Sequence, residues 1–411
     1  MAATEILRDS KVSGDELLAR VRALLPGIAA RAQETEALRR PHDDTIAELI
    51  EADIMRMLVP KRFGGHELGL ETLTAVGRAL AQSCMSTAWV TAFYLGHNWM
   101  LTKFPEQAQA EFFADKSYTM APIQPSPMLE IKPVAGGYEV NGRSSYSSGI
   151  MHADWVILAK SGGPDARAFV VRKEEIKVDD VWFMSGMSGT GSNDVIAHNL
   201  FVPEHRTLDT ATLFNTTASV HANPIYHIPL LPFIYCEVMG VYVGGLEGAT
   251  SACEDIMRKK VRAHIGDKLA ERQSVHINLG QAHARIQACD TLLERLVTDT
   301  QAAALANAFD IEKRLELKLR AGLMVDLCRQ SINEMISLSG TSAFRQDAPL
   351  QRFFRDLNTL ATHVFVDAQV AYELWGRHRL GLEPNSPISV SYTHLRAHET
   401  KANLVCRLLL E

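Results

Sequence analysis

Four side chains in this sequence are of the types that move protons or hold a reacting oxygen atom. His97 follows Trp89 by eight positions in an apolar segment whose spacing predicts a helix. His363 and Asp367 are four positions apart in another predicted helix, where a carboxylate can orient or charge an imidazole. Ser148 stands in the sequence YSSG. These residues suit proton transfer in a pocket, with a core histidine, a surface ion pair and a turn serine as the structural alternatives.

A second group of residues is of the types that bind polar or anionic ligands. Thr190 and Ser192 lie in GMSGTGSNDV, a loop with enough glycine to bring backbone N–H groups close to a ligand. Arg262 stands in RAHIG, where its planar guanidinium suits a phosphate group and a solvated helix arginine is the alternative. The six cysteines are scattered without a C-x-x-C pair, which predicts buried thiols in a reducing compartment and no metal site.

The elements that would position these residues fall into three successive regions. Residues 1–117 show helical periodicity and are predicted to form an N-terminal helical domain. Residues 118–222 form a middle β domain of short strands, with hairpin turns predicted at Gly136–Gly137 and in SGGPD. Residues 223–389 are predicted to form a C-terminal four-helix bundle, because four long periodic segments are joined by short loops. These segments are Phe233 to Met257, Ala270 to Ala302, Ile311 to Leu338 and Pro349 to Trp375.

The composition excludes several classes of protein. Hydrophobic residues make up 46% and charged residues 22% of the 411 residues, as in an ordinary globular protein. The net charge of -6 is spread along the chain, so we expect no nucleic-acid partner. No apolar run approaches the roughly 20 residues of a membrane span, and the start of the chain does not resemble a signal peptide. We therefore expect a cytoplasmic protein without a membrane partner.

The last residues do not fit the rest of the chain. Val390 to Thr400 and Leu404 to Glu411 match translations of two pieces of a DNA-sequencing transposon adapter, and the three residues between them fit an index barcode. We interpret residues 390–411 as a sequencing remnant without function, with a natural amphipathic tail as the alternative. The residues that naturally follow Ser389 are then unknown.

Four sequence motifs, in this order, resemble the oxygenase components of two-component flavin-dependent monooxygenases. That group includes p-hydroxyphenylacetate hydroxylases, the secosteroid hydroxylase and the dibenzothiophene monooxygenase. The resemblance extends over residues 10–389 and implies the acyl-CoA dehydrogenase fold, α+β but mostly α, with the three regions described above. The motifs are STAWVTAFYLGHNWM, YSSGIMHADWVILA, GMSGTGSNDV with FVPEHR, and RFFRDLNTLATH.

The resemblance also implies a chemistry. A reductase supplies reduced flavin (FMN or FAD), which reacts with oxygen to form a C4a-hydroperoxide that oxygenates a small substrate, with an aromatic compound as one candidate. Ser148 resembles the serine beside flavin N5, whose hydroxyl can donate to the peroxide. Trp89 and His97 resemble residues that line the pocket, where the histidine can deprotonate a phenol. His363 resembles a histidine near the reacting edge of the flavin. Arg262 resembles an arginine that meets the flavin phosphate across subunits, which implies a homotetramer, with a dimer as the fallback.

Two differences from the sequence pattern of this group, and one alternative enzyme class with the same fold, leave the substrate undetermined. Ile123 stands where phenol hydroxylases of the group place a serine, and Arg143 to Ser145 occupy a stretch that often holds a tryptophan. Both put a phenolic substrate in doubt, but not flavin binding. The main alternative is an FAD-dependent acyl-CoA dehydrogenase with Glu237 as its base. N-oxygenases, sulfur oxygenases and a non-catalytic flavin-binding protein are further alternatives.

Overall fold

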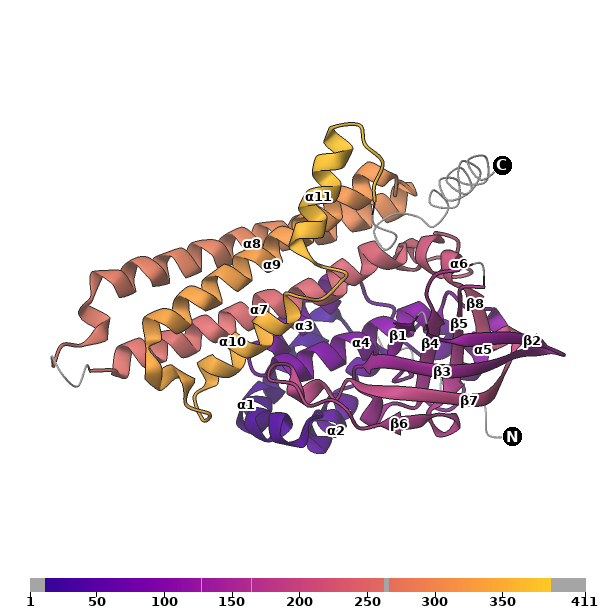
Figure 1. Ribbon diagram of the computed structural model, residues 1–411, viewed down its shortest axis with the longest axis horizontal. Helices are drawn as coiled ribbons and strands as arrows, with labels where there is room; N and C mark the ends of the chain where they lie inside the picture. Colours follow the sequence, from indigo (N-terminus) through magenta and orange to yellow (C-terminus); the bar gives the residue numbers. More distant parts are fainter. Residues whose placement is uncertain (1–11, 127, 164, 262–265, 386–411) are drawn as a thin grey trace, which may run out of the picture.

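The computed structural model describes residues 12–126, 128–163, 165–261 and 266–385. Helices come first, two sheets follow, and long helices complete the described chain (Figure 1). This order is the one that the acyl-CoA dehydrogenase fold implies. The predictions for Arg262 and for residues 390–411 lie outside the described residues.

The N-terminal helices pack around one almost completely buried helix. α4 is apolar on nearly all sides, and of its residues only Phe93 is more than slightly exposed, which explains why the sequence there lacks a polar face. The helices are α1 (Gly14–Leu38), α2 (Asp43–Glu51), α3 (Leu70–Ala81), α4 (Met85–Leu101) and α5 (Glu106–Phe112).

Two four-stranded sheets form the middle region. One has the order β1-β4-β5-β8 and the other β2-β3-β7-β6, and β1 with β4 is the parallel pair. Both predicted hairpins are present, β2 with β3 and β4 with β5. Along β4 the side chains alternate: Val156 and Leu158 join the core between the sheets, whereas Ile157 and Ala159 join the helical core. The strands are β1 (Ile123–Ser126), β2 (Glu130–Val134), β3 (Gly137–Ser147), β4 (Trp155–Lys160), β5 (Arg167–Arg172), β6 (Lys177–Asp179), β7 (Asn193–Pro203) and β8 (Thr207–Asp209).

Long helices form the C-terminal region and enclose one face of the N-terminal helices (Figure 1). α7 approaches α3 closely, because a Cβ at Gly240 or Gly244 would lie 2.3 or 2.1 Å from the backbone oxygen of Thr74 or Arg78. Gly240 and Gly244 therefore allow the close packing of α7 against α3. The helices are α6 (Thr210–Asn215), α7 (Leu230–Lys259), α8 (Gln273–Ala306), α9 (Ile311–Ser339), α10 (Pro349–Leu360) and α11 (Ala368–Arg379).

The last predicted helix is wrong in one respect. The segment Pro349 to Trp375 is not continuous, since α10 ends at Leu360 and α11 begins at Ala368. The intervening THVFV stretch contains three β-branched residues, which are weak helix formers, and the Asp367 side chain accepts the N–H of Val370 as the N-cap of α11. His363 therefore lies on a turn and not on a helix face.

α7 is the one helix among the described residues that is long and apolar enough to cross a membrane by length and composition. Of its most apolar window, 89% is buried inside the protein, as in the core helix of a globular fold. The five described cysteines are all free and buried. No group of three potential metal ligands occurs among the described residues.

Candidate active site

An aromatic row on α4 joins the two candidate histidines. Trp89, Phe93 and His97 recur every fourth residue, and their rings are in sequence 4.7 Å and 5.1 Å apart between centroids. The His363 ring meets Trp89 edge to face at 5.2 Å. Residues that are far apart in the sequence thus form one continuous series of ring contacts from His97 to His363.

His97 is held in a defined protonation state. Its ring is 2% exposed, and Nδ1 lies 2.5 Å from the carbonyl oxygen of Ala121. Because a carbonyl only accepts, Nδ1 carries the proton and Nε2 retains a lone pair. Burial lowers the pKa of His97 to about 4, so the ring is neutral at pH 7 and can accept a proton or a hydrogen bond at Nε2.

His363 lacks the partner that the sequence predicts for it. Its Nδ1 is buried without a hydrogen bond, while the Asp367 carboxylate caps α11. The expected pairing of His363 with Asp367 is therefore wrong, because the helix on which it depended is broken between them. Burial lowers the pKa of His363 to about 4, which keeps the imidazole neutral. An unsatisfied buried nitrogen beside a tryptophan ring is a group that a ligand can satisfy.

Ser148 belongs to a chain of three hydroxyl groups. Its Oγ lies 2.8 Å from Ser192 Oγ, which lies 2.7 Å from Thr190 Oγ1. Thr190 Oγ1 in turn donates to the carbonyl oxygen of Met187 at 2.9 Å. The structure thus brings together the three hydroxyl residues that the sequence proposes for this site.

The direction of this chain follows from its last bond. Each hydroxyl has one proton. The Thr190 proton goes to a carbonyl, so Ser192 must donate to Thr190, and Ser148 must donate to Ser192. Toward a ligand, Ser148 Oγ is then an acceptor. The sequence-based expectation gave this hydroxyl the role of a donor, which requires its proton to leave Ser192.

The turn that carries Ser148 rests directly on α4. Gly149 adopts φ +83°, and a Cβ there would come within 2.7 Å of both Val90 Cγ1 and Tyr94 Oη. The Tyr94 hydroxyl donates to the carbonyl oxygen of Gly149, and the Gly149 N–H donates to the carbonyl oxygen of Thr190 at 2.9 Å. Only glycine fits this contact, which sets the hydroxyl chain beside the helix of the aromatic row.

The loop that carries Met187, Thr190 and Ser192 is also bound to α10. The Met187 N–H donates to the buried Asp356 carboxylate at 2.5 Å, and burial raises the pKa of Asp356 to about 6. Arg355 binds both Glu36 of α1 and the carbonyl oxygen of Ser185. These contacts join the N-terminal helices, the β region and the bundle around one place. Tyr94 and Asp356 were missed from the sequence, although Asp356 stands inside the RFFRDL motif.

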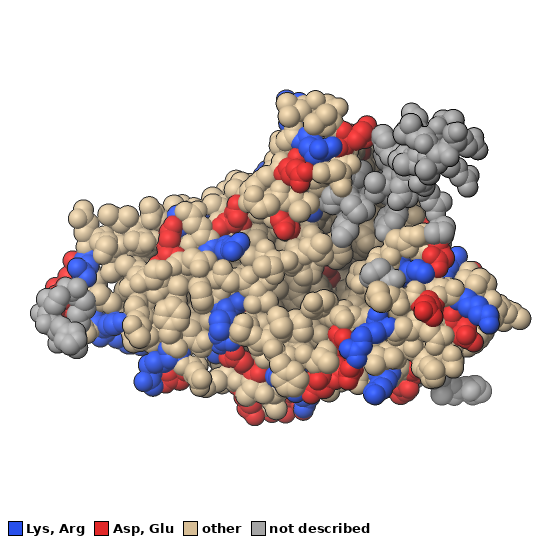
Figure 2. Space-filling model, in the orientation of Figure 1, with Lys and Arg blue, Asp and Glu red and all other residues tan. Residues whose placement is uncertain are grey.

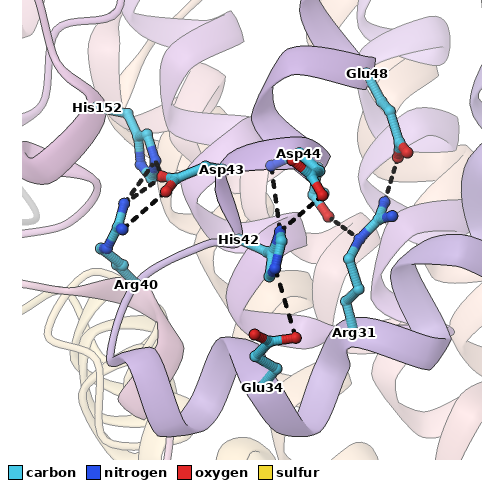
Figure 3. A network of polar contacts seen from close by, with 9 residues as sticks. Arg31, Glu34, Arg40, His42, Asp43, Asp44, Glu48 and His152 are labelled. Carbon is cyan, nitrogen blue, oxygen red and sulfur yellow. Dashed lines mark hydrogen bonds and ion pairs between the residues drawn. The ribbon is translucent and has the colours of Figure 1, made fainter.

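A polar cluster fixes the next turn of the β region to the N-terminal helices (Figure 3). His152, which ends the short 3-10 helix after Gly149, lies 2.7 Å from Asp43 Oδ1 and 3.2 Å from Arg40. Arg40 also pairs with Asp43, and that hydrogen bond lowers the pKa of Asp43 to about 2. The clamp connects the corner between α1 and α2 to the Ser148–Gly149 turn.

Glu237 does not occupy the position of a ready base. It is 1% exposed, and a Cβ at Gly96 would come within 1.8 Å of its Oε1, so the carboxyl group packs on the backbone of α4. Burial raises its pKa well above the usual range, and Oε1 has no hydrogen-bond partner. Burial without a polar partner thus favours the neutral carboxyl group over the carboxylate that a base requires, which disfavours the dehydrogenase alternative.

A groove of about 780 Å³ lies elsewhere, between α1, α3 and α8. None of the residues proposed for the site lines it. Arg78 is one of the residues that line this groove, and it pairs with Glu247 and Asp290.

Three of the proposed residues have side chains whose chemistry suits a flavin ring system. Trp89 offers an aromatic face, Ser148 offers an acceptor for a ring N–H, and His363 Nδ1 offers an unsatisfied polar atom. Arg262, proposed for the phosphate, lies outside the described residues. When bound, reduced flavin supplies the electrons with which dioxygen is activated.

Comparisons with known proteins identify the family of the chain. Residues 15–119 match the family described as "Acyl-CoA dehydrogenase, N-terminal domain", and residues 238–368 match "Acyl-CoA dehydrogenase, C-terminal domain". The pigment production hydroxylase of Rhodococcus sp. (strain ATCC 21145) is 40% identical over 385 residues, which cover 92% of this chain and 99% of that protein.

Two oxygenases extend the comparison. The flavin-dependent monooxygenase oxygenase subunit HsaA of Rhodococcus jostii is 34% identical over 88% of this chain and 98% of its own length. The crystal structure of the HsaA monooxygenase from M. tuberculosis has a TM-score of 0.84 at 31% identity, covering 92% of this chain and all of that one. The chain therefore belongs to the flavin-dependent monooxygenase oxygenase components that are built on the acyl-CoA dehydrogenase fold.

Proposed function

We propose that this protein takes reduced FMN or FAD from a separate reductase and uses dioxygen to oxygenate a small aromatic substrate between His97 and His363. The observation that carries the proposal is the direction of the hydroxyl chain. Reduced flavin has a proton on N5, whereas oxidised flavin does not. An acceptor at Ser148 Oγ is complementary to the reduced form, which is the form that an oxygenase component must retain.

The residues divide the remaining tasks between them. Ser148 accepts the flavin N5–H, with Ser192 and Thr190 orienting its hydroxyl group. His97 accepts the proton of a substrate hydroxyl at Nε2, which makes an aromatic ring more nucleophilic. His363 lies at the reacting edge, and the rings of Trp89 and Phe93 exclude water. Arg262 binds the flavin phosphate. Asp367 receives no catalytic task.

The substrate class is proposed from the relatives. One is named a p-hydroxyphenylacetate 3-hydroxylase and another a resorcinol hydroxylase, and both names describe phenols. Ile123 is partly buried and packs on the helical core. Its side chain has no hydroxyl group that could bind a phenol. In this protein the neutral His97 is the group that meets the substrate hydroxyl.

We further propose a cytoplasmic homotetramer that binds neither nucleic acid nor membranes. Acidic and basic side chains are interspersed over the face shown in Figure 2, without a field of one sign. An arginine that reaches the flavin of another subunit requires at least a dimer, which is the fallback. Light scattering at micromolar concentration should give a tetramer, and a monomeric mass contradicts this arrangement.

The function is tested by supplying the protein with reduced FMN or FAD, ¹⁸O₂ and a panel of phenols and aromatic amines. We expect one ¹⁸O atom in an aromatic product, and unlabelled product after incubation in ¹⁶O₂ with H₂¹⁸O. A parallel anaerobic titration adds acyl-CoA thioesters to the protein with oxidised FAD. Bleaching of the flavin by a thioester, without any oxygenated product, overturns the proposal in favour of the dehydrogenase.

A further inference from the structure

The segment that carries His363 is not held by helical hydrogen bonds. Between α10 and α11 its internal bonds are single turns, such as His363 N–H to Leu360 O at 2.9 Å and Val366 N–H to His363 O at 3.0 Å. Side chains from two other helices bind carbonyl groups at the end of α10 and within the segment. The Tyr242 hydroxyl of α7 donates to Leu360 O at 2.6 Å, and Lys318 Nζ of α9 donates to Phe365 O at 3.2 Å.

Lys318 is an unusual residue for the interior of a helix bundle. It is 2% exposed, and Phe365 O is the hydrogen-bond acceptor recorded for its ammonium group in the described structure. The Tyr235 ring lies 5.9 Å away, and the Asp367 carboxylate provides a favourable charge. Burial lowers the pKa of Lys318 to about 8, because a charged ammonium group loses hydration there.

The helix behind Lys318 is a firm support for this contact. One turn further along α9, a Cβ at Gly322 would come within 2.8 Å of Ala371 Cβ and 3.1 Å of Ala368 Cα. α9 and α11 are therefore in close contact just after the segment ends. Lys318, which is on α9, therefore links this packed pair of helices to the segment that bears His363.

Stability alone does not account for a lysine here. A buried cation with one carbonyl acceptor is costly, and an apolar side chain of similar length is often tolerated as well or better in such a place. What the apolar side chain cannot do is bind Phe365 O. Phe365 follows His363 by two residues, and its ring lies 5.5 Å from the His363 ring. A contact at Phe365 O therefore restrains the imidazole through the short intervening backbone and the Phe365 ring.

We propose that Lys318 is a positioning residue for His363: by binding Phe365 O, it holds the segment 361–367 so that the His363 ring stays edge-on to Trp89. The proposal rests on the role that the proposed function gives to His363. Lys318 itself touches neither flavin nor substrate. Its effect reaches the reaction through the place of the imidazole.

The first test is hydrogen exchange of the ligand-free protein, read by mass spectrometry, in Lys318→Met. Exchange in a peptide over residues 360–368 should accelerate about ten- to hundredfold, the factor expected for a lost hydrogen bond from a charged donor. Exchange along α9 should not accelerate, and the thermal unfolding midpoint should not fall below that of the wild type. Lys318→Arg, which keeps a cationic donor, should restore part of the protection, and Lys318→Gln serves if the methionine variant does not fold.

Lys103 provides the matched control. It is also buried, donates to Tyr226 O and Ile228 O, and has its pKa lowered to about 7 by burial. Lys103→Met removes the same chemistry at another place, and should leave exchange over residues 360–368 as in the wild type. Unchanged exchange over these residues in Lys318→Met overturns the proposal.

The second readout separates this proposal from the role of His363. Reduced FMN bound to each variant is mixed with oxygen, and the rate at which oxidised FMN returns is recorded. Lys318→Met should move this rate toward that of His363→Ala. If exchange accelerates but the rate stays at the wild-type value while His363→Ala changes it, the link from Lys318 to His363 is refuted. If His363→Ala itself has no effect, the proposed role of His363 is what fails.

Discussion

Ser148→Ala removes the one hydroxyl that the proposed flavin site turns toward N5. The Ser148 proton is committed to Ser192 at 2.8 Å, so the loss toward the flavin is one acceptor for the N5–H. A neutral hydrogen bond of this kind contributes about 1–1.5 kcal/mol, and about 1.4 kcal/mol is a factor of ten in rate. Hydrogen peroxide should therefore be released about five- to tenfold sooner after the complex with reduced FMN meets oxygen.

The assay is stopped-flow mixing with a peroxide-coupled probe and the return of oxidised-flavin absorbance as a second signal. Ser147→Ala is the matched control, because the neighbouring Ser147 Oγ accepts from Gln124 Nε2 at 2.6 Å and belongs to a different contact. This control should release peroxide at the wild-type rate. An unchanged rate in Ser148→Ala, or equal effects of both alanines, would refute the assigned role.

Three further predictions concern residues outside the hydroxyl chain. His97→Gln should slow oxygenation of a phenol at least tenfold, as expected when a positioned base is lost, while reduced flavin still binds; product formation and anaerobic flavin binding measure the two separately. Glu237→Gln should raise the unfolding midpoint relative to the wild type, and this gain should grow as the pH rises above about 5. The raised pKa of Glu237 means that the folded state retains a proton which the unfolded state loses, so the stability of the wild type falls as the pH rises. A gain that does not grow with pH would contradict the raised pKa. Deletion of residues 390–411 should leave the melting temperature and flavin binding unchanged, and a fall of several degrees would show that the segment is part of the fold.

Periodicity and turn chemistry predict much of the fold. Alternation and paired glycines give the β2–β3 hairpin, and helical spacing gives α4 with Trp89 and His97 on one side. Sequence spacing does not reveal the break after Leu360. The β-branched residues that follow are weak helix formers, but their apolar spacing continues the helical pattern. The carbonyl groups of Leu360 and Phe365 are bound by side chains from distant helices. Tertiary contacts thus override the local pattern.

The candidate site was accessible from the sequence to a similar extent. Residue types and motif order identify Ser148, Thr190 and Ser192, but only coordinates show that their hydroxyl groups form one directed chain ending on Met187. The pairing of His363 with Asp367 failed because it depended on one continuous helix. The close contact of Gly149 with Val90 and Tyr94 has no signature in a single sequence, since glycine in a turn has many explanations.

The central claim is that Ser148 faces the flavin as an acceptor and so selects the reduced form. The direct measurement is the anaerobic dissociation constant of the protein for reduced FMN, compared with that for oxidised FMN under the same conditions. We predict that reduced FMN binds at least about tenfold more tightly, the factor for one hydrogen bond made in one form and lost in the other, and that Ser148→Ala reduces this difference. Equal or tighter binding of oxidised FMN by the wild-type protein would contradict the account.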